Sequence, residues 1–167
     1  DRWFGRATRV GFGEARFHEI QARFRQRTGD ALGAIAAADR AAANHPGDPF
    51  FAELQAQTRA TAGAVDPRYA VDALERYADL VREWPNHGGY FNGIGVAEIM
   101  RGDRSAARAA FEQAIELSPL GAEGYENLAR LNALEGDVDA AVAVLDAGIA
   151  TALNPASLAA MRASLAP

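Results

Sequence analysis

The residue types that most often perform chemistry in proteins are scarce in this chain. It has no cysteine and no lysine, and its 17 basic residues are all arginines. Without cysteine the chain can form no disulfide, thiolate metal site or cysteine nucleophile. Without lysine it can form no lysine-dependent phosphate loop, Schiff base or Ser-Lys dyad.

The three histidines, His18, His45 and His87, are not spaced as metal ligands. His18 begins the stretch HEIQA, which lacks the second histidine of an HExxH zinc motif. His45 precedes Pro46 and His87 follows Pro85, so we expect both in corners between helical units. A metal site would need ligands converging from separate units, and no local spacing proposes one. We therefore predict no metal site and no cofactor.

Glycine-rich stretches and paired carboxylates are the other candidates for chemistry. GFGEAR and GIGVAE both lack the last glycine of a dinucleotide-binding fingerprint, and neither follows a predicted strand. The pairs Glu112/Glu116 and Asp137/Asp139 fall on helix faces or at a helix start, where they solvate the surface or favour the helix dipole. Active-site acids need a pocket that shifts their pKa, and the sequence indicates none. We predict no catalytic residue and expect that the chain is not an enzyme.

The composition favours helices over strands. Hydrophobic residues make up 49% of the chain, and many are alanine, which has the highest helix propensity and lets helices pack closely. Valine and isoleucine alternate over no long stretch, so strands are poorly supported. The net charge of −5 argues against nucleic-acid binding, and no apolar run is long enough to span a membrane.

The N-terminal end differs from the rest in charge. Residues 1–27 hold seven arginines and three acidic residues. They form either a solvated helix face or a basic end that docks on an acidic partner or membrane surface. The first 13 residues also carry Trp3, Phe4, Val10 and Phe12 without a clear helical pattern. This domain, a second copy or a missing segment must cover them, so we predict self-association or docking through this segment.

A repeat of 34 residues is the strongest pattern in the sequence. Under this shift, large residues align with large ones and small residues with small ones, at helical spacing. The aligned positions are Phe91 and Tyr125, Ile94 and Leu128, Gly95 and Ala129, Gly102-Asp103 and Gly136-Asp137, Ala107 and Ala141, Phe111 and Leu145, Ala114 and Gly148, and Ile115 and Ile149. Because antiparallel helices approach closely only at small side chains, we expect Gly95 to face Ala107 and Ala129 to face Ala141.

This pattern resembles the tetratricopeptide repeat family. The family motif places a large residue and an aliphatic–small pair on a first helix, then small, large and small residues on a second helix, with a proline near its end. Pro119 stands where that proline belongs. The resemblance implies an all-α fold, an α-solenoid of stacked antiparallel helix pairs that forms a right-handed superhelix and ends in a C-terminal capping helix.

The repeat divides the chain into segments. We expect a basic and aromatic N-terminal segment over 1–13, a degenerate first unit over 14–49, a second unit with an enlarged turn over 50–87, a third unit over 88–121, a fourth unit over 122–155 and a capping helix over 156–167. In the second unit, Pro67 breaks any continuous helix.

The tripeptide Arg101-Gly102-Asp103 is known as an adhesion ligand, but its place in the repeat predicts a turn. Gly102 would close one helix with a positive φ, and Asp103 would cap the next. Gly136-Asp137 repeats the same two residues at the equivalent position. We therefore expect a corner between helices and not a displayed recognition loop.

The resemblance also implies a binding surface, because the first helices of successive repeats line a concave groove. The side chains expected to face it are Arg59, Asn92, Val96, Ile99, Glu126, Asn127 and Arg130. The family's best-defined peptide mode holds a C-terminal carboxylate with lysines and asparagines, and Asn127 falls on one of those asparagine positions. Since the lysines are missing and Val96 replaces a polar contact, we do not expect a carboxylate clamp of the chaperone-binding kind.

The function implied by the resemblance is a non-enzymatic scaffold that binds a protein segment or subunit, within a larger bacterial assembly. The alternative is an accessory domain of a larger enzyme or membrane-anchored assembly protein whose active part lies outside this chain. HPGDPFFAELQAQ resembles the repeat tails of cell-envelope metallopeptidases. The absence of cysteine and the start at Asp1 favour the bacterial periplasm or cell envelope over the cytoplasm.

Overall fold

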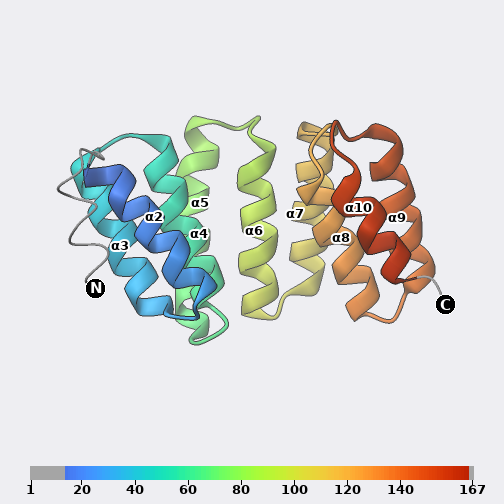
Figure 1. The fold of residues 1–167 in the computed structure, drawn as a ribbon, viewed down its shortest axis with the longest axis horizontal. Coiled ribbons are helices and arrows are strands. Elements are labelled where there is room, and N and C mark those ends of the chain that lie inside the picture. The colour runs from blue at the N-terminus through green and yellow to red at the C-terminus, as the bar shows by residue number, and fades with distance from the viewer. Residues whose placement is uncertain (1–13, 166–167) are drawn as a thin grey trace. The chain divides into compact units, whose positions relative to one another are not determined.

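The computed structural model describes residues 14–165, in which every regular element is an α-helix (Figure 1). The helices are α2 (Glu14–Arg27), α3 (Ala31–Asn44), α4 (Pro49–Ala62), α5 (Pro67–Glu83), α6 (Gly88–Arg101), α7 (Arg104–Leu117), α8 (Glu123–Leu134), α9 (Val138–Thr151) and α10 (Ala156–Ser164). They form two compact units, each larger than a single repeat: the first unit ends at Glu83, and the second unit begins at Trp84. The predicted all-α fold of stacked helix pairs is confirmed. The predicted docking residues Trp3, Phe4 and Phe12 lie outside the described residues.

The first unit packs four helices in chain order. α2 lies on α3, α3 on α4 and α4 on α5, with consecutive helices running in opposite directions (Figure 1). The core is built largely from alanine, which lets the helices approach closely. Its buried residues are Ala22, Ala37, Ala38, Ala41, Phe51 and Leu54. As expected, Pro67 separates two helices, and it is the first residue of α5, where its missing N–H is not needed.

The second unit contains two helix pairs and a final single helix. α6 pairs with α7, α8 pairs with α9, and α10 packs on α9 and α8. Ala129 and Ala141 share one core cluster, as the repeat predicts. At Gly95 a Cβ would overlap the ring of Phe111, so the absence of a side chain there is what admits that ring. The repeat pattern had indicated Ala107 as the residue that faces Gly95. The residue that Gly95 accommodates is instead Phe111, one helical turn after Ala107.

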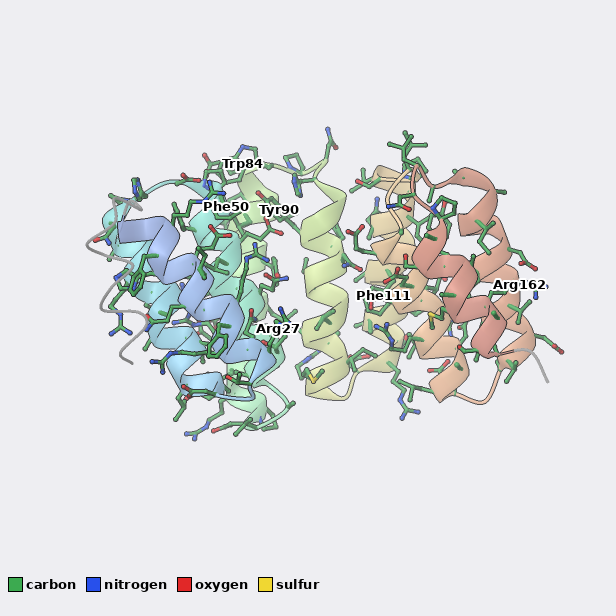
Figure 2. All side chains as sticks on the ribbon, in the orientation of Figure 1. Arg27, Phe50, Trp84, Tyr90, Phe111 and Arg162 are labelled. Carbon is green, nitrogen blue, oxygen red and sulfur yellow. The ribbon has the colours of Figure 1, made fainter. Side chains whose placement is uncertain are left out.

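α10 closes the open end of the second unit. Its buried residue Leu158 joins the cluster of Tyr125, Ala129 and Leu145, and Met161 and Leu165 pack against the same cluster. Arg162, labelled in Figure 2, bonds from Nε to Asp146 Oδ1 of α9 at 2.5 Å. Apolar burial and one ion pair thus hold the capping helix in place.

The turns between paired helices follow the predicted chemistry. Gly29, Gly102 and Gly136 have φ between 78° and 92°, a left-handed conformation that favours glycine. The next residue in each case is an aspartate whose Oδ1 accepts the backbone N–H three residues later at 2.9 Å. In the Arg101-Gly102-Asp103 turn, the Arg101 guanidinium is also 3.2 Å from the Asp103 carboxylate. The prediction of a helix corner is confirmed.

Candidate protein-binding surface on α6 and α8

The residues predicted to face the groove lie on three helices. Arg59 is on α4 in the first unit, and the other six are on α6 and α8 in the second unit. α6 and α8 contact each other directly. The six side chains of the second unit can therefore form one surface, to which Arg59 of the first unit does not belong.

Three of the predicted polar side chains join in a chain of hydrogen bonds. Asn127 Nδ2 donates to Asn92 Oδ1 at 2.9 Å, which links α8 to α6. Arg130 Nη1 donates to Asn127 Oδ1, also at 2.9 Å. The two asparagines are half-buried and Arg130 is exposed. Asn127 thus holds the guanidinium in a defined position on the surface.

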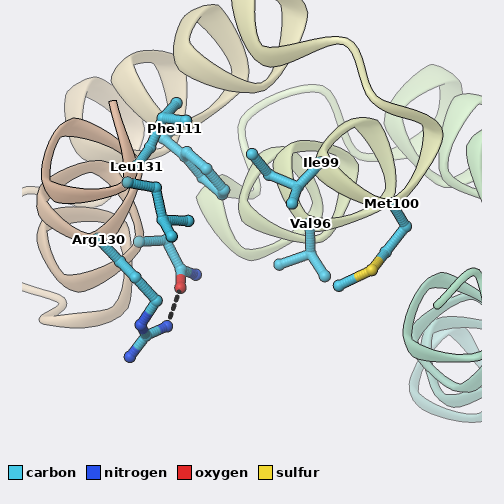
Figure 3. A pocket seen from close by; sticks show the side chains of 8 residues that line it. Val96, Ile99, Met100, Phe111, Arg130 and Leu131 are labelled. Carbon is cyan, nitrogen blue, oxygen red and sulfur yellow. Dashed lines mark hydrogen bonds between the residues drawn. The ribbon is translucent and has the colours of Figure 1, made fainter. Parts of the chain in front are cut away.

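A largely apolar pocket of about 140 Å³ lies beside the hydrogen-bonded side chains of Asn127 and Arg130 (Figure 3). Its lining residues are Val96, Ile99, Met100, Phe111, Asn127, Arg130, Leu131 and Leu134. Figure 3 shows Val96, Ile99 and Met100 on one side and Arg130 and Leu131 on the other. The pocket contains four of the predicted surface residues.

The other four lining residues were not among those predicted. Met100 follows Val96 by four residues, and Leu134 follows Arg130 by four, so each continues a helix face already identified. Leu134 is 64% exposed, and this spacing could have found it. Phe111 and Leu131 are buried core residues that also reach the pocket, and no sequence pattern separates that role from simple packing.

Arg130 carries a charge that no carboxylate neutralises within the described residues. Its hydrogen-bond partner is the neutral Asn127, and Glu126, one turn earlier on α8, forms no ion pair with it and does not line the pocket. Of the other four arginines of this unit, three have acidic partners, and Arg104 at the exposed start of α7 has no ion pair within the described residues. These pairs are Arg101 with Glu98, Arg108 with Glu135 and Arg162 with Asp146. The pocket therefore combines apolar walls with a positive charge at one side.

Arg59 occupies a different setting. It is only 6% exposed, and its guanidinium bonds Asp72 on α5 at 2.6 Å and Asp39 on α3 at 2.9 Å. Burial alone would lower the pKa of Arg59, but hydrogen bonds to these two carboxylates outweigh it and raise that pKa. Arg59 thus connects three helices within the first unit. Because its donors are engaged there, we leave it out of the proposed surface.

His45 and His87 lie at the helix corners that were expected for them, and His18 lies within α2. His45 ends α3 and stacks on Phe51, with ring centroids 5.3 Å apart. His87 caps the start of α6 and stacks on Tyr90 at 4.1 Å. Within residues 14–165, no group of three or more histidine, aspartate or glutamate side chains could hold a metal ion. None of the helices described is both long and apolar enough to cross a membrane.

Comparison with known proteins accounts for the repeat. Residues 99–157 match a family model described as Tetratricopeptide repeat. Residues 99–157 therefore contain tetratricopeptide repeat sequence. The predicted resemblance is therefore confirmed, and the Arg101-Gly102-Asp103 corner and the helices α7, α8 and α9 fall within the matched range.

Solved structures show the same fold over nearly the whole chain. A crystal structure of a thermophilic tetratricopeptide repeat protein from Thermus thermophilus is 21% identical, with a TM-score of 0.78, covering 97% of this chain and 86% of that one. A structure of MamA is 14% identical, with a TM-score of 0.57 and coverage of 98% and 88%. A repeat protein from Parabacteroides merdae ATCC 43184 is 18% identical, with a TM-score of 0.59 and coverage of 90% and 57%. The search of curated proteins gave no match.

Proposed function

We propose that this chain is a non-enzymatic protein–protein interaction scaffold that holds a segment of a partner protein against the surface formed by α6 and α8. The observation that carries this proposal is the apolar pocket beside the hydrogen-bonded chain of Asn92, Asn127 and Arg130. Tetratricopeptide repeats are in general scaffolds for protein partners, and their stacked helices provide extended binding surfaces. The bound segment would belong to another subunit of a larger assembly.

The proposed contact residues combine the predicted side chains with those of the pocket. They are Asn92, Val96, Ile99, Met100, Glu126, Asn127, Arg130 and Leu134. The apolar members supply buried area, and the polar members supply direction and register. Glu126 is included because it is half-buried and lies on α8 next to Asn127.

Site-specific photo-crosslinking tests the surface. A benzoylphenylalanine placed at Leu134 lies beside the pocket, and the same group at Ala109 lies on the exposed face of α7. In cells that express the intact protein, we expect Leu134 to crosslink to a defined partner and Ala109 not to do so. The Asn127→Ala, Arg130→Glu double variant should lose the crosslink. Equal crosslinking from both positions, or a crosslink that survives the double variant, would reject this surface.

A further inference from the structure

We infer that the pocket between α6 and α8 takes one bulky apolar side chain from an acidic segment of the partner, and that Arg130 binds an aspartate or glutamate beside that side chain. This inference rests on the proposed function, because it specifies what the same surface recognises. It adds a chemical definition of the partner segment, which the fold alone does not provide.

The size and lining of the pocket limit what can enter it. Six of the eight lining residues are apolar, and the volume is about 140 Å³. A cavity of about 150 Å³ lined by leucine, isoleucine and phenylalanine stays dry and accepts one benzene molecule. The pocket therefore accommodates a single side chain the size of leucine, methionine or phenylalanine. A polar side chain held against the six apolar lining residues would lose its hydration without gaining a hydrogen-bond partner from them.

Arg130 determines the charge of the neighbouring residue. A guanidinium has five N–H donors in a fixed fork, and Arg130 uses one of them on Asn127. The remaining donors can bind one carboxylate through two parallel hydrogen bonds. Asn127 keeps the fork in place beside the pocket, and its own amide is engaged by Asn92. A partner carboxylate at this position would pair with a guanidinium that has no acidic partner within residues 14–165.

The carboxylate is assigned to a side chain and not to a chain terminus. Along α8, Arg130 lies between Asn127 and Leu134, and Leu134 extends the apolar surface one turn beyond the guanidinium. A partner whose chain ended at Arg130 would leave uncovered the surface on one side of Arg130, either that at Asn127 or that at Leu134. A segment that continues past Arg130 covers both. We therefore assign the acidic residue to the interior of the partner segment.

Selection from random peptides tests the inference directly. Two libraries of 12-residue peptides, one with free C-termini and one with the C-terminus linked to a carrier, are selected against the full chain. We expect both libraries to enrich peptides with leucine, methionine or phenylalanine within four residues of an acidic residue. Selection against Arg130→Glu should replace the acidic residue by lysine or arginine. Enrichment from the free-terminus library alone would overturn the assignment to a side chain.

Affinity measurements test the role of the acidic residue separately from that of the apolar side chain. They use the best peptide with an acetylated N-terminus and an amidated C-terminus, so that the peptide carries no terminal carboxylate. Replacing the acidic residue of the peptide by asparagine or glutamine should weaken binding about 10-fold or more. Arg130→Gln should weaken binding of the original peptide by the same factor. The two changes together should weaken binding no more than either change alone. Arg104→Gln, an exposed change at the start of α7, is the matched control and should leave affinity unchanged. Far-ultraviolet circular dichroism verifies that each variant is folded.

The outcomes distinguish failure of the inference from failure of the proposed function. If binding is abolished by Ile99→Lys but is indifferent to the peptide's acidic residue and to Arg130→Gln, the surface stands and the acidic specificity is wrong. If no selected peptide is sensitive to Ile99→Lys, the surface does not bind peptides, and both proposals fail.

Discussion

Buried polar side chains recur near the end of the first helix in successive pairs. They are Arg59 on α4, Glu98 on α6 and Asn132 on α8. Glu98 accepts a hydrogen bond from Arg101 at 2.7 Å, whereas Arg59 is bound by carboxylates from two other helices. The sequence could place Arg59 on a first helix but could not show this burial, because its partners Asp39 and Asp72 come from other helices.

Removing the Arg59 guanidinium should destabilise the first unit. In Arg59→Leu, Asp39 and Asp72 lose a shared partner. Breaking a fully buried ion pair costs about 3–5 kcal/mol, and we expect about 1–3 kcal/mol here because both carboxylates are partly exposed to water. Urea denaturation measures the change. Arg68→Ala, at a side chain that is 90% exposed, is the control and should leave the free energy of unfolding nearly unchanged.

The contribution of Asp39 should depend on pH. Burial alone would raise the pKa of Asp39, but hydrogen bonds from Arg59 and Gln55 outweigh it and hold the pKa below its usual value. The stabilisation is therefore complete above the unfolded pKa, about 3.9, and is lost as the pH falls through the folded pKa. We expect Asp39→Asn to be less stable than the wild type at pH 7 and the difference to shrink below about pH 4. A difference that stays constant from pH 7 to pH 3 would contradict this.

Among the elements, α6 and α7 depend on a close approach at one glycine. A Cβ in Gly95→Ala would overlap the Phe111 ring. Alanine gains about 1 kcal/mol in helix propensity, but overpacking costs about 1–3 kcal/mol. We expect a net loss of up to about 2 kcal/mol in the free energy of unfolding, measured by urea denaturation. In a Phe111→Leu background the same substitution should cost less, because the ring that it meets is gone. An equal loss of stability in the two backgrounds would show that overlap with the Phe111 ring is not the cause of the loss.

The packing of the capping helix α10 against the second unit should depend mainly on Leu158. Leu158 is fully buried against Tyr125 and Leu145, so Leu158→Ala removes apolar contacts and leaves a cavity. We expect a loss of about 2–4 kcal/mol in the free energy of unfolding. Ser157→Ala, at the exposed neighbouring position, should be within about 0.5 kcal/mol of the wild type. A Leu158→Ala protein as stable as the wild type would mean that α10 does not contribute to the core.

At the scale of the whole molecule, the repeat made the fold predictable and left much of the surface undetermined. Alignment of small and large residues at a 34-residue shift identified helix pairs and their turns, because close packing imposes those residue types at each repeat. It also placed Asn92, Asn127 and Arg130 on first helices. The hydrogen bonds among them and the pocket depend on how three helices pack, since Phe111 comes from α7 and is also a core residue.

The central claim is that a partner segment binds between α6 and α8, and nuclear magnetic resonance tests it most directly. The full chain of 17.7 kDa is titrated with the best selected peptide while side-chain methyl and arginine Nε signals are followed. We predict that the largest shifts occur at Ile99, Met100, Leu134 and Arg130. Shifts concentrated on α9 or α10, with these four unchanged, would contradict the account.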